Sequence, residues 1–530
     1  MQRRAFIKTV APLATVLPAL LSGLSVKAYS SLPFLGGWNG SGAADNDHVL
    51  VLIQMFGGND GLNTVIPFDQ YSAYNNLRNN IAIPESAILT LGPNDKSGLH
   101  PAMTGLQSLY KNNQLAIIQG VTYPSPDESH FRATDIYLTG SDSDQYLNTG
   151  WVGRVLGQTY TNYPTGYPNA TMPDPLAIQI GSVLSPTFIS NGGMTAMAVP
   201  EDADFYSLIN GLTGPEPDTP MGTELTYLRT IARQTDKYAA VVTAAAAKVT
   251  QQYSGYPANN DLANQLKTVA RLVAGGLKTK VYMVNIGGFD THGGQVNGGD
   301  PTNGAHAILL GQVSDAITAF MKDLKFLGID QRVLGMTFSE FGRRIVSNGS
   351  LGTDHGAGQP VFIFGSAAQT GILGNTPTLP TTMDVEAVVP MQYDFRSVYS
   401  TILRDWFCIA PADVDTMLLN NYQYLPFIES TACNNTIADL SNIGDNLILN
   451  YPNPFVDSTN ITYTTSGGHT LVQVFDVAGH LIAVPVDTVY SSSGTYTVNF
   501  ATNYLAAGIY YARFQNGSVQ QVKTMLKMNQ

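Results

Sequence analysis

The chain has little cysteine and little charge, and both shortages limit what it can be. Only two of its 530 residues are cysteines, Cys408 and Cys433, which excludes a disulfide framework and every zinc motif built from several cysteines. A disulfide between these two is one possibility in an oxidising compartment, and two unrelated buried thiols are the other. Charged residues make up 12% of the chain, about half of the roughly 25% usual in soluble domains. The surface must therefore depend on hydroxyls, amides and tyrosines.

A basic surface is also missing. The chain has 27 Lys and Arg against 39 Asp and Glu, a formal net charge of −12. We therefore expect no nucleic acid partner, because binding phosphates needs a basic face. The same balance suits a protein that holds metal cations. With 44% hydrophobic residues the chain can bury a large core, and its length predicts two or three folding units.

The only long apolar stretch lies at the N-terminus. Residues 1–28 place Arg3, Arg4 and Lys8 ahead of an apolar run that ends in small residues, which is typical of a signal peptide. The paired arginines resemble a twin-arginine export signal, and an ordinary secretory signal is the alternative. No other stretch approaches the roughly 18 apolar residues of a membrane span. We therefore expect an exported protein with no stable membrane span.

Two parts of the chain have different patterns. Over residues 45–430, short apolar runs alternate with helical patterns, which predicts an α/β fold with a parallel-rich sheet flanked by helices. The predicted strands are 49–55, 115–119, 176–180, 280–286, 332–338 and 361–364, and the predicted helices are 100–112, 224–249 and 305–327. Residues 431–446 are a polar linker. Residues 447–530 show short alternating strands separated by turn residues, which predicts an all-β, Ig-like sandwich.

Ligands of an open parallel sheet bind beyond the carboxyl ends of its strands. The residues that follow each strand are therefore the candidates for a binding site. These positions hold acidic and imidazole side chains: Asp60, Asp290, His292 and Glu340, together with Asp354 and His355 in a glycine-bounded loop. Such groups are the ligands of divalent metals. Each alone is also compatible with a turn, a surface position or a helix start. Their convergence at one sheet edge predicts a metal site.

The segment after the strand 115–119 offers a nucleophile. Ser129 stands at a predicted helix start, where unpaired N–H groups favour an anionic phosphate or sulfate. The alternative is that Ser129 only caps the helix. The next residue, His130, is a candidate metal ligand or substrate contact. Arg343 is a candidate for holding an anionic substrate, although an ion pair within the protein is the safer assumption.

Six motifs in order resemble the DUF1501 family, which is related to the alkaline phosphatase/sulfatase superfamily. They are GGNDGLNTVIP (57–67), SHFRATDIYLTG (129–140), GWVGR (150–154), GFDTH (288–292), TFSEFGRR (337–344) and GTDHG (352–356). The resemblance covers residues 45–430 and implies an alkaline phosphatase-like sheet with a metal site at one edge.

By position, the resemblance implies a role for each candidate. Ser129 would be near the nucleophile, and the metal ligands would be Asp60, Asp290, His292, Glu340 and His355. Phe341 stands where the superfamily has a histidine, so a second metal would lose a ligand unless His130 or Asp354 replaces it. No Cys-x-Pro-x-Arg element exists, which excludes a formylglycine nucleophile.

The C-terminal part resembles a type IX secretion system type A sorting domain. The resemblance rests on YPNPF (451–455), VFDVAG (474–479), LAAGIYY (505–511) and the closing stretch 523–527. It implies the type IX secretion machinery as a partner and a final place outside the cell or on the outer-membrane surface. A carbohydrate-binding Ig-like module is the alternative.

Together these features predict an exported metal-dependent hydrolase of a phosphate or sulfate ester. Its cofactor would be one or more divalent ions such as zinc, manganese or calcium, and its substrate an anionic ester or a glycan. The alternative is a cell-surface binding or envelope-assembly protein that keeps the fold without turnover.

Overall fold

The computed structural model describes residues 46–93, 95–199, 238–429, 433 and most of 448–528. In the C-terminal range it leaves out 452, 454, 466, 477–479, 493, 502–504 and 518. The predicted signal peptide, residues 1–28, lies outside the described residues, as does almost all of the predicted linker, 431–446.

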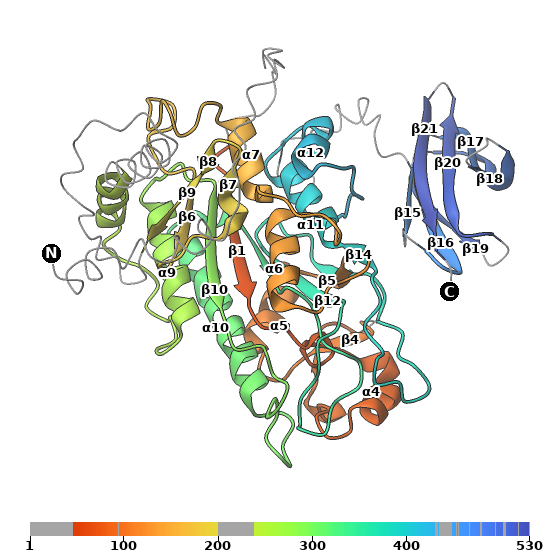
Figure 1. Ribbon diagram of the computed structural model, residues 1–530, viewed down its shortest axis with the longest axis horizontal. Helices are drawn as coiled ribbons and strands as arrows, with labels where there is room; N and C mark the ends of the chain where they lie inside the picture. The colour runs from red at the N-terminus through yellow and green to blue at the C-terminus, as the bar shows by residue number, and fades with distance from the viewer. Residues whose placement is uncertain are drawn as a thin grey trace.

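The larger part is built on one mixed sheet of nine strands (Figure 1). Its order is β13 (Gly371–Leu373), β5 (Leu115–Thr122), β12 (Gln359–Gly365), β11 (Val333–Phe338), β1 (Val49–Met55), β10 (Val281–Ile286), β6 (Ala177–Ile180) and β9 (Ala196–Val199), with β14 (Tyr393–Asp394) beside β5. All six predicted strands of this region are present within a few residues of their expected ends. The parallel-rich α/β prediction is confirmed.

One strand departs from the parallel arrangement. β12 runs antiparallel to both of its neighbours, β11 and β5. Its start therefore lies at the edge where β1, β10 and β11 end, and β5 ends at that edge as well. This reversal explains why a loop that precedes a strand, residues 352–356, can join loops that follow strands.

Helices cover both faces of the sheet. The strand β1 alternates between two cores: Val49, Val51 and Ile53 pack on one side, and Leu50 and Leu52 on the other. The first side is covered by α5 (Thr104–Lys111), α9 (Asp261–Ala274) and α10 (Ala305–Phe326), and the second by α6 (His130–Thr139), α7 (Trp151–Thr159), α11 (Phe395–Thr401) and α12 (Pro411–Leu418). Of the predicted helix 224–249, residues 238–248 are helical and 224–237 lie outside the described residues.

A small sheet flanks the segment that follows β1. After the short helix α3 (Gly61–Thr64) comes a three-stranded sheet of order β2 (Val65–Pro67), β4 (Ser97–Leu99), β3 (Leu89–Thr90). The helix α4 (Tyr71–Leu77) lies between β2 and β3 in the chain. Its own apolar cluster includes Leu62, Ile66 and Tyr74. This subdomain anchors the chain beside the end of β1.

The C-terminal part, blue in Figure 1, consists of two antiparallel sheets. One contains β15 (Ile448–Tyr451), β16 (Ser458–Thr465) and β19 (Gly494–Ala501), and the other β18 (Leu481–Tyr490), β17 (Gly468–Asp476), β20 (Gly508–Asn516) and β21 (Val519–Lys527). Along β17, every second residue is buried, as period-2 patterning requires. The two sheets share a core that includes Val472, Val474 and Phe514. The all-β prediction is confirmed.

Two further features concern the chain as a whole. Cys408 and Cys433 form a disulfide that ties the end of the larger part to residue 433. Among the residues that the structure describes, no helix combines the length and the apolarity that a membrane crossing needs.

Candidate metal site

Three loops at one edge of the sheet bring imidazoles and a carboxylate together. His130 opens α6, just beyond β5, and Asp290 and His292 follow β10. His355 lies in the loop before β12, whose backbone bridges to Arg343. One ring nitrogen of His130, one carboxylate oxygen of Asp290 and one ring nitrogen of His355 lie within 4.8 Å of one another. Of the predicted ligand set, Asp290, His292 and His355 therefore lie together, with His130 beside them.

Oδ1 of Asp290 is the point on which three imidazoles converge. It lies 3.6 Å from Nε2 of His130, 3.3 Å from Nε2 of His292 and 3.5 Å from Nε2 of His355. Ligand atoms bonded to zinc at about 2.0–2.1 Å lie about 3.3 Å apart in a tetrahedron. The spacing of these atoms therefore suits one cation held between them.

The outer nitrogen of each imidazole has its own acceptor. Nδ1 of His130 lies 2.7 Å from Oε1 of Glu340, and Nδ1 of His355 lies 2.7 Å from the carbonyl oxygen of Glu128. Such acceptors hold the proton on Nδ1 and leave Nε2 unprotonated. Its lone pair is then free to bind a metal ion, as is usual for histidines that bind metals.

His292 completes this pattern through Asp354. Its Nδ1 lies 2.9 Å from Oδ1 of Asp354, and its Nε2 lies 2.9 Å from Nε2 of His355. Two bare nitrogens at this distance repel each other unless a proton or a cation lies between them. The hydrogen bond from His292 lowers the pKa of Asp354, and burial lowers the pKa of His355, so both groups favour the forms that bind a cation.

A buried nitrogen of the cluster also lacks a hydrogen-bond partner. Within the described part of the chain, Nε2 of His130 is buried without a hydrogen bond. A buried nitrogen without a partner costs free energy. We therefore expect a hydrogen-bond donor or a cation at Nε2 of His130.

Glu340 lies behind the cluster rather than in it. Its Oε1 accepts from the Gly57 amide at 2.9 Å as well as from His130, and its Oε2 accepts from the Ser339 hydroxyl at 3.0 Å. The close approach needs glycine at position 57, where φ is +123° and a Cβ would lie 2.3 Å from the amide nitrogen of Asp290. Glu340, expected from the sequence as a ligand, faces Nδ1 of His130 in the structure.

Arg343 is fully engaged within the protein. Its guanidinium donates to the carbonyl oxygens of Gly58 at 2.7 Å and Thr353 at 2.8 Å, and to Oδ1 of Asp290 at 2.7 Å. Burial would raise the pKa of Asp290, but the hydrogen bond and charge of Arg343 outweigh it and lower the pKa. Arg343 therefore joins the loops of the site and keeps Asp290 ionised, and its side chain is 0% exposed.

Asp60 does not join the cluster. It is 1% exposed, and both of its carboxylate oxygens lie 3.0 Å from Nη1 of Arg78. Oδ2 also accepts from the Gln295 amide at 2.5 Å. Burial alone would raise the pKa of Asp60, but the charges of Arg78 and His306 and these hydrogen bonds lower it. The carboxylate forms a buried ion pair that fixes the loop after β1.

Beside this ion pair, the buried His306 should make the protein acid-sensitive. Burial lowers its pKa to about 4, whereas an unfolded histidine titrates near 6.5. The unfolded chain therefore binds more protons between these values, so the free energy of unfolding falls as the pH drops from about 6.5 to about 4. Urea midpoints at pH 7.5, 5.5 and 4.5 measure this, and His306→Gln, which can still donate to Asn59, should show a smaller fall. An equal fall in both proteins would contradict the assignment to His306.

Ser129 stands at the N-cap of α6 and is exposed. Its hydroxyl makes no capping hydrogen bond, while its amide donates to Oδ1 of Asp127 at 2.7 Å. It directly precedes His130 in the chain, and its role as nucleophile stays a prediction.

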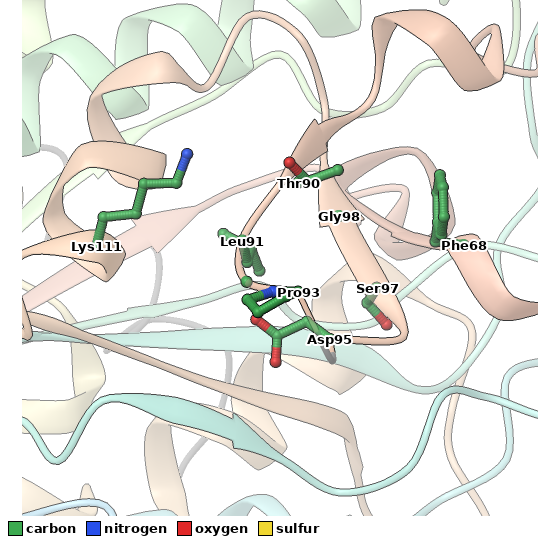
Figure 2. A pocket seen from close by; sticks show the side chains of 9 residues that line it. Phe68, Thr90, Leu91, Pro93, Asp95, Ser97, Gly98 and Lys111 are labelled. Atoms are coloured by element: carbon green, nitrogen blue, oxygen red, sulfur yellow. The ribbon is translucent and has the colours of Figure 1, made fainter.

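A cavity of about 420 Å³ lies elsewhere in the molecule (Figure 2). It is lined by residues of β3, β4 and the end of α5, including Thr90, Gly98 and Lys111. None of the metal-site candidates lines it, so it is not part of this site.

Sequence reasoning missed the groups that support the ligands. Nothing in the spacing points to Arg78 as the partner of Asp60, or to the carbonyl of Glu128 as the acceptor for His355. One sequence signal does point to the site: His130 stands at a predicted helix start that follows the strand 115–119.

Comparisons with known proteins agree with two of the sequence expectations. Residues 212–407 match the family described as "Protein of unknown function (DUF1501)", and residues 450–528 match the "Secretion system C-terminal sorting domain". The resemblance to DUF1501 is thereby confirmed over the segment that holds Asp290, His292, Glu340 and His355. The sorting domain implies export to the cell surface or beyond. No curated protein matches the chain.

Solved structures with a similar arrangement include members of the expected superfamily. A protein in the alkaline phosphatase superfamily from Vibrio parahaemolyticus is 10% identical, with 84% of each chain covered and a TM-score of 0.34. A phosphonate monoester hydrolase from Silicibacter pomeroyi is 10% identical, with 90% of this chain and 87% of that one covered and a TM-score of 0.33. These likenesses are distant, and the chemistry of the site rests on its own geometry.

Proposed function

We propose that the protein is an exported metal-dependent hydrolase of phosphate or sulfate esters. The observation that carries the proposal is the convergence of three Nε2 atoms, each with its Nδ1 on a fixed acceptor, on one oxygen of Asp290. The sorting domain supports delivery by the type IX secretion machinery to the outer-membrane surface or the medium. A twin-arginine leader would let the chain cross the inner membrane after acquiring its metal.

The donor set fits a divalent ion of the zinc type. His130, Asp290 and His355 would hold it, which is the three-ligand set of catalytic zinc sites with one position left open. Imidazole nitrogens favour zinc over calcium, which prefers oxygen ligands. Phe341 is buried against His130 and His355 and contributes no donor, which favours a single ion. When bound, such an ion polarises an ester oxygen and neutralises developing charge.

The chain's own residues would supply the remaining functions. Glu340 and the Glu128 carbonyl orient the rings of His130 and His355, and Arg343 holds Asp290 ionised. His292, whose Nδ1 faces Asp354, would present its bare Nε2 beside the ester, where it could accept a proton. Ser129 would bring its hydroxyl to the mouth of the site as the nucleophile.

The test uses the full chain, stripped with a chelator and reloaded with zinc, manganese or calcium. Metal content is measured, together with hydrolysis of 4-nitrophenyl phosphate, 4-nitrophenyl sulfate and bis(4-nitrophenyl) phosphate. We expect about one zinc per chain and hydrolysis of at least one ester only after reloading. A protein that takes up no metal and leaves all three esters intact would contradict the proposal.

Glu340→Gln should weaken the metal affinity about 10–100-fold, because partners of a ligating imidazole commonly contribute that much. The amide keeps the shape of the side chain but removes the charge that Nδ1 of His130 faces. Competition with a chromophoric chelator measures the change. Glu128→Gln is the matched control, since Glu128 serves His355 through its backbone carbonyl. Equal affinities for both variants and the native protein would rule out this role for Glu340.

The position of His292 favours a second candidate, a non-catalytic surface protein with a structural metal. If Nε2 of His292 binds as a fourth ligand, the site is closed, as structural zinc sites are. His292→Ala separates the two functions. A hydrolase should keep its metal and lose activity, whereas a structural site should lose metal and thermal stability together.

A further inference from the structure

Exposed aromatic rings gather around the first turn of α6. Phe131 is 90% exposed, Tyr146 is 80% exposed and Phe56 is 44% exposed. Among the residues that the structure describes, two other aromatic side chains, Phe68 and Phe326, are comparably exposed, and neither lies on α6 or its neighbouring loops. Rings that lie in water add little to the stability of the fold, so their presence around the first turn of α6 calls for another reason.

Two of the rings are held in place. The guanidinium of Arg132 lies 4.0 Å from the ring centroid of Tyr146. Arg132 is itself fixed by the carbonyl oxygens of Asp142 at 3.0 Å and Ser143 at 3.1 Å. The ring of Phe56 lies 5.8 Å from that of His130. Rings ordered in advance bind a partner at a lower entropic cost.

The polar groups nearby limit what the rings can hold. Carboxylates reach the solvent nearby: Glu128 lies on the segment that enters α6, and Asp142 and Asp144 lie on the loop that carries Tyr146. The cations are committed: Arg132 to Asp135 and the loop carbonyls, and Arg344 to Glu128 and Glu386. Carboxylates would repel a polyanion, and no uncommitted cation offsets them. A lipid chain needs a continuous apolar surface, whereas polar groups separate these rings.

A sugar ring matches both features. Its C–H faces pack on aromatic rings, and its hydroxyls donate hydrogen bonds to carboxylates. We propose that Phe56, Phe131 and Tyr146 form a platform for the uncharged saccharide part of a glycan ester whose anionic group reaches the metal site. This inference rests on the proposed function for the ester but not for the binding of the sugar.

The platform is tested by binding rather than by turnover. The metal-free full chain is applied to an immobilised array of neutral and sulfated glycans, and affinities for the retained glycans are measured by calorimetry. We expect retention of at least one glycan. Phe131→Ala and Tyr146→Ala should each weaken it by about fivefold, the loss expected for one stacked ring. Phe68→Ala is the matched control and should bind like the native chain.

The outcomes separate this inference from the proposed function. Retention of no glycan, or equal affinities for the two platform variants and the control, would overturn the platform even if the 4-nitrophenyl esters are hydrolysed. If the chain binds a glycan through the platform but hydrolyses no ester, the result supports the platform and contradicts the proposed hydrolase function. Both variants are at exposed positions, and thermal unfolding checks that they fold as the native chain does.

Discussion

Replacing His355 with alanine should remove metal binding from the full chain. Structural zinc sites bind with about 10–16 kcal/mol, so one of three protein ligands contributes about 3–5 kcal/mol, or about 10²–10⁴-fold in affinity. Metal analysis after dialysis should find the variant empty. The rise in melting temperature that the native protein gains from added zinc should disappear as well, because a ligand stabilises only the state that binds it.

His480→Ala is the control for this prediction. His480 is exposed on the C-terminal part, where its Nδ1 lies 3.0 Å from Oδ2 of Asp476, a His–Asp pair remote in sequence from the cluster. It should keep the native metal content and zinc-induced stabilisation. If His355→Ala also keeps both, the cluster around Asp290 is not the metal site.

Replacing Arg78 with alanine should destabilise the fold by about 3–5 kcal/mol, the usual cost of leaving one partner of a buried ion pair alone. Asp60 would lose its cation, and the carbonyl oxygens of Ile345 and Arg344 would each lose a donor. Urea unfolding at neutral pH measures the loss. Lys96→Ala, which breaks the exposed pair with Asp69, should change stability by less than about 1 kcal/mol.

Asp60→Asn distinguishes an ion pair from a ligand role at the same position. If Asp60 serves the fold, this variant should lose stability while its zinc content stays native. A variant that keeps its stability but loses its metal would return Asp60 to the ligand set that the sequence suggested.

The strands and the edge of the sheet were predictable because buried strands have a strong local signature. The runs 49–55, 280–286 and 332–338 are continuous and apolar, as strands covered on both faces must be. Once the sheet is assumed to be parallel, the residues after each run belong at one edge. Asp290, His292 and His355 lie there together with His130.

The roles within that edge were not predictable, because they depend on distances between loops. Glu340 and Asp60 follow strands just as Asp290 does, yet one accepts from His130 and the other pairs with Arg78. Which carboxylate lies among the imidazoles depends on Arg343, which donates to the loops of Gly58, Thr353 and Asp290. It also depends on how closely the backbone of Gly57 approaches that of Asp290.

By itself, the sequence determined that two folding units exist, that the first is a layered α/β sheet and that the second is all β, because hydrophobic periodicity is a local property. It also determined which residue types crowd the strand ends. Only the tertiary structure decided that β12 runs antiparallel and so brings His355 to the edge where β10 ends. Strand direction and side-chain contacts are set by packing between segments far apart in the chain, which no local pattern encodes.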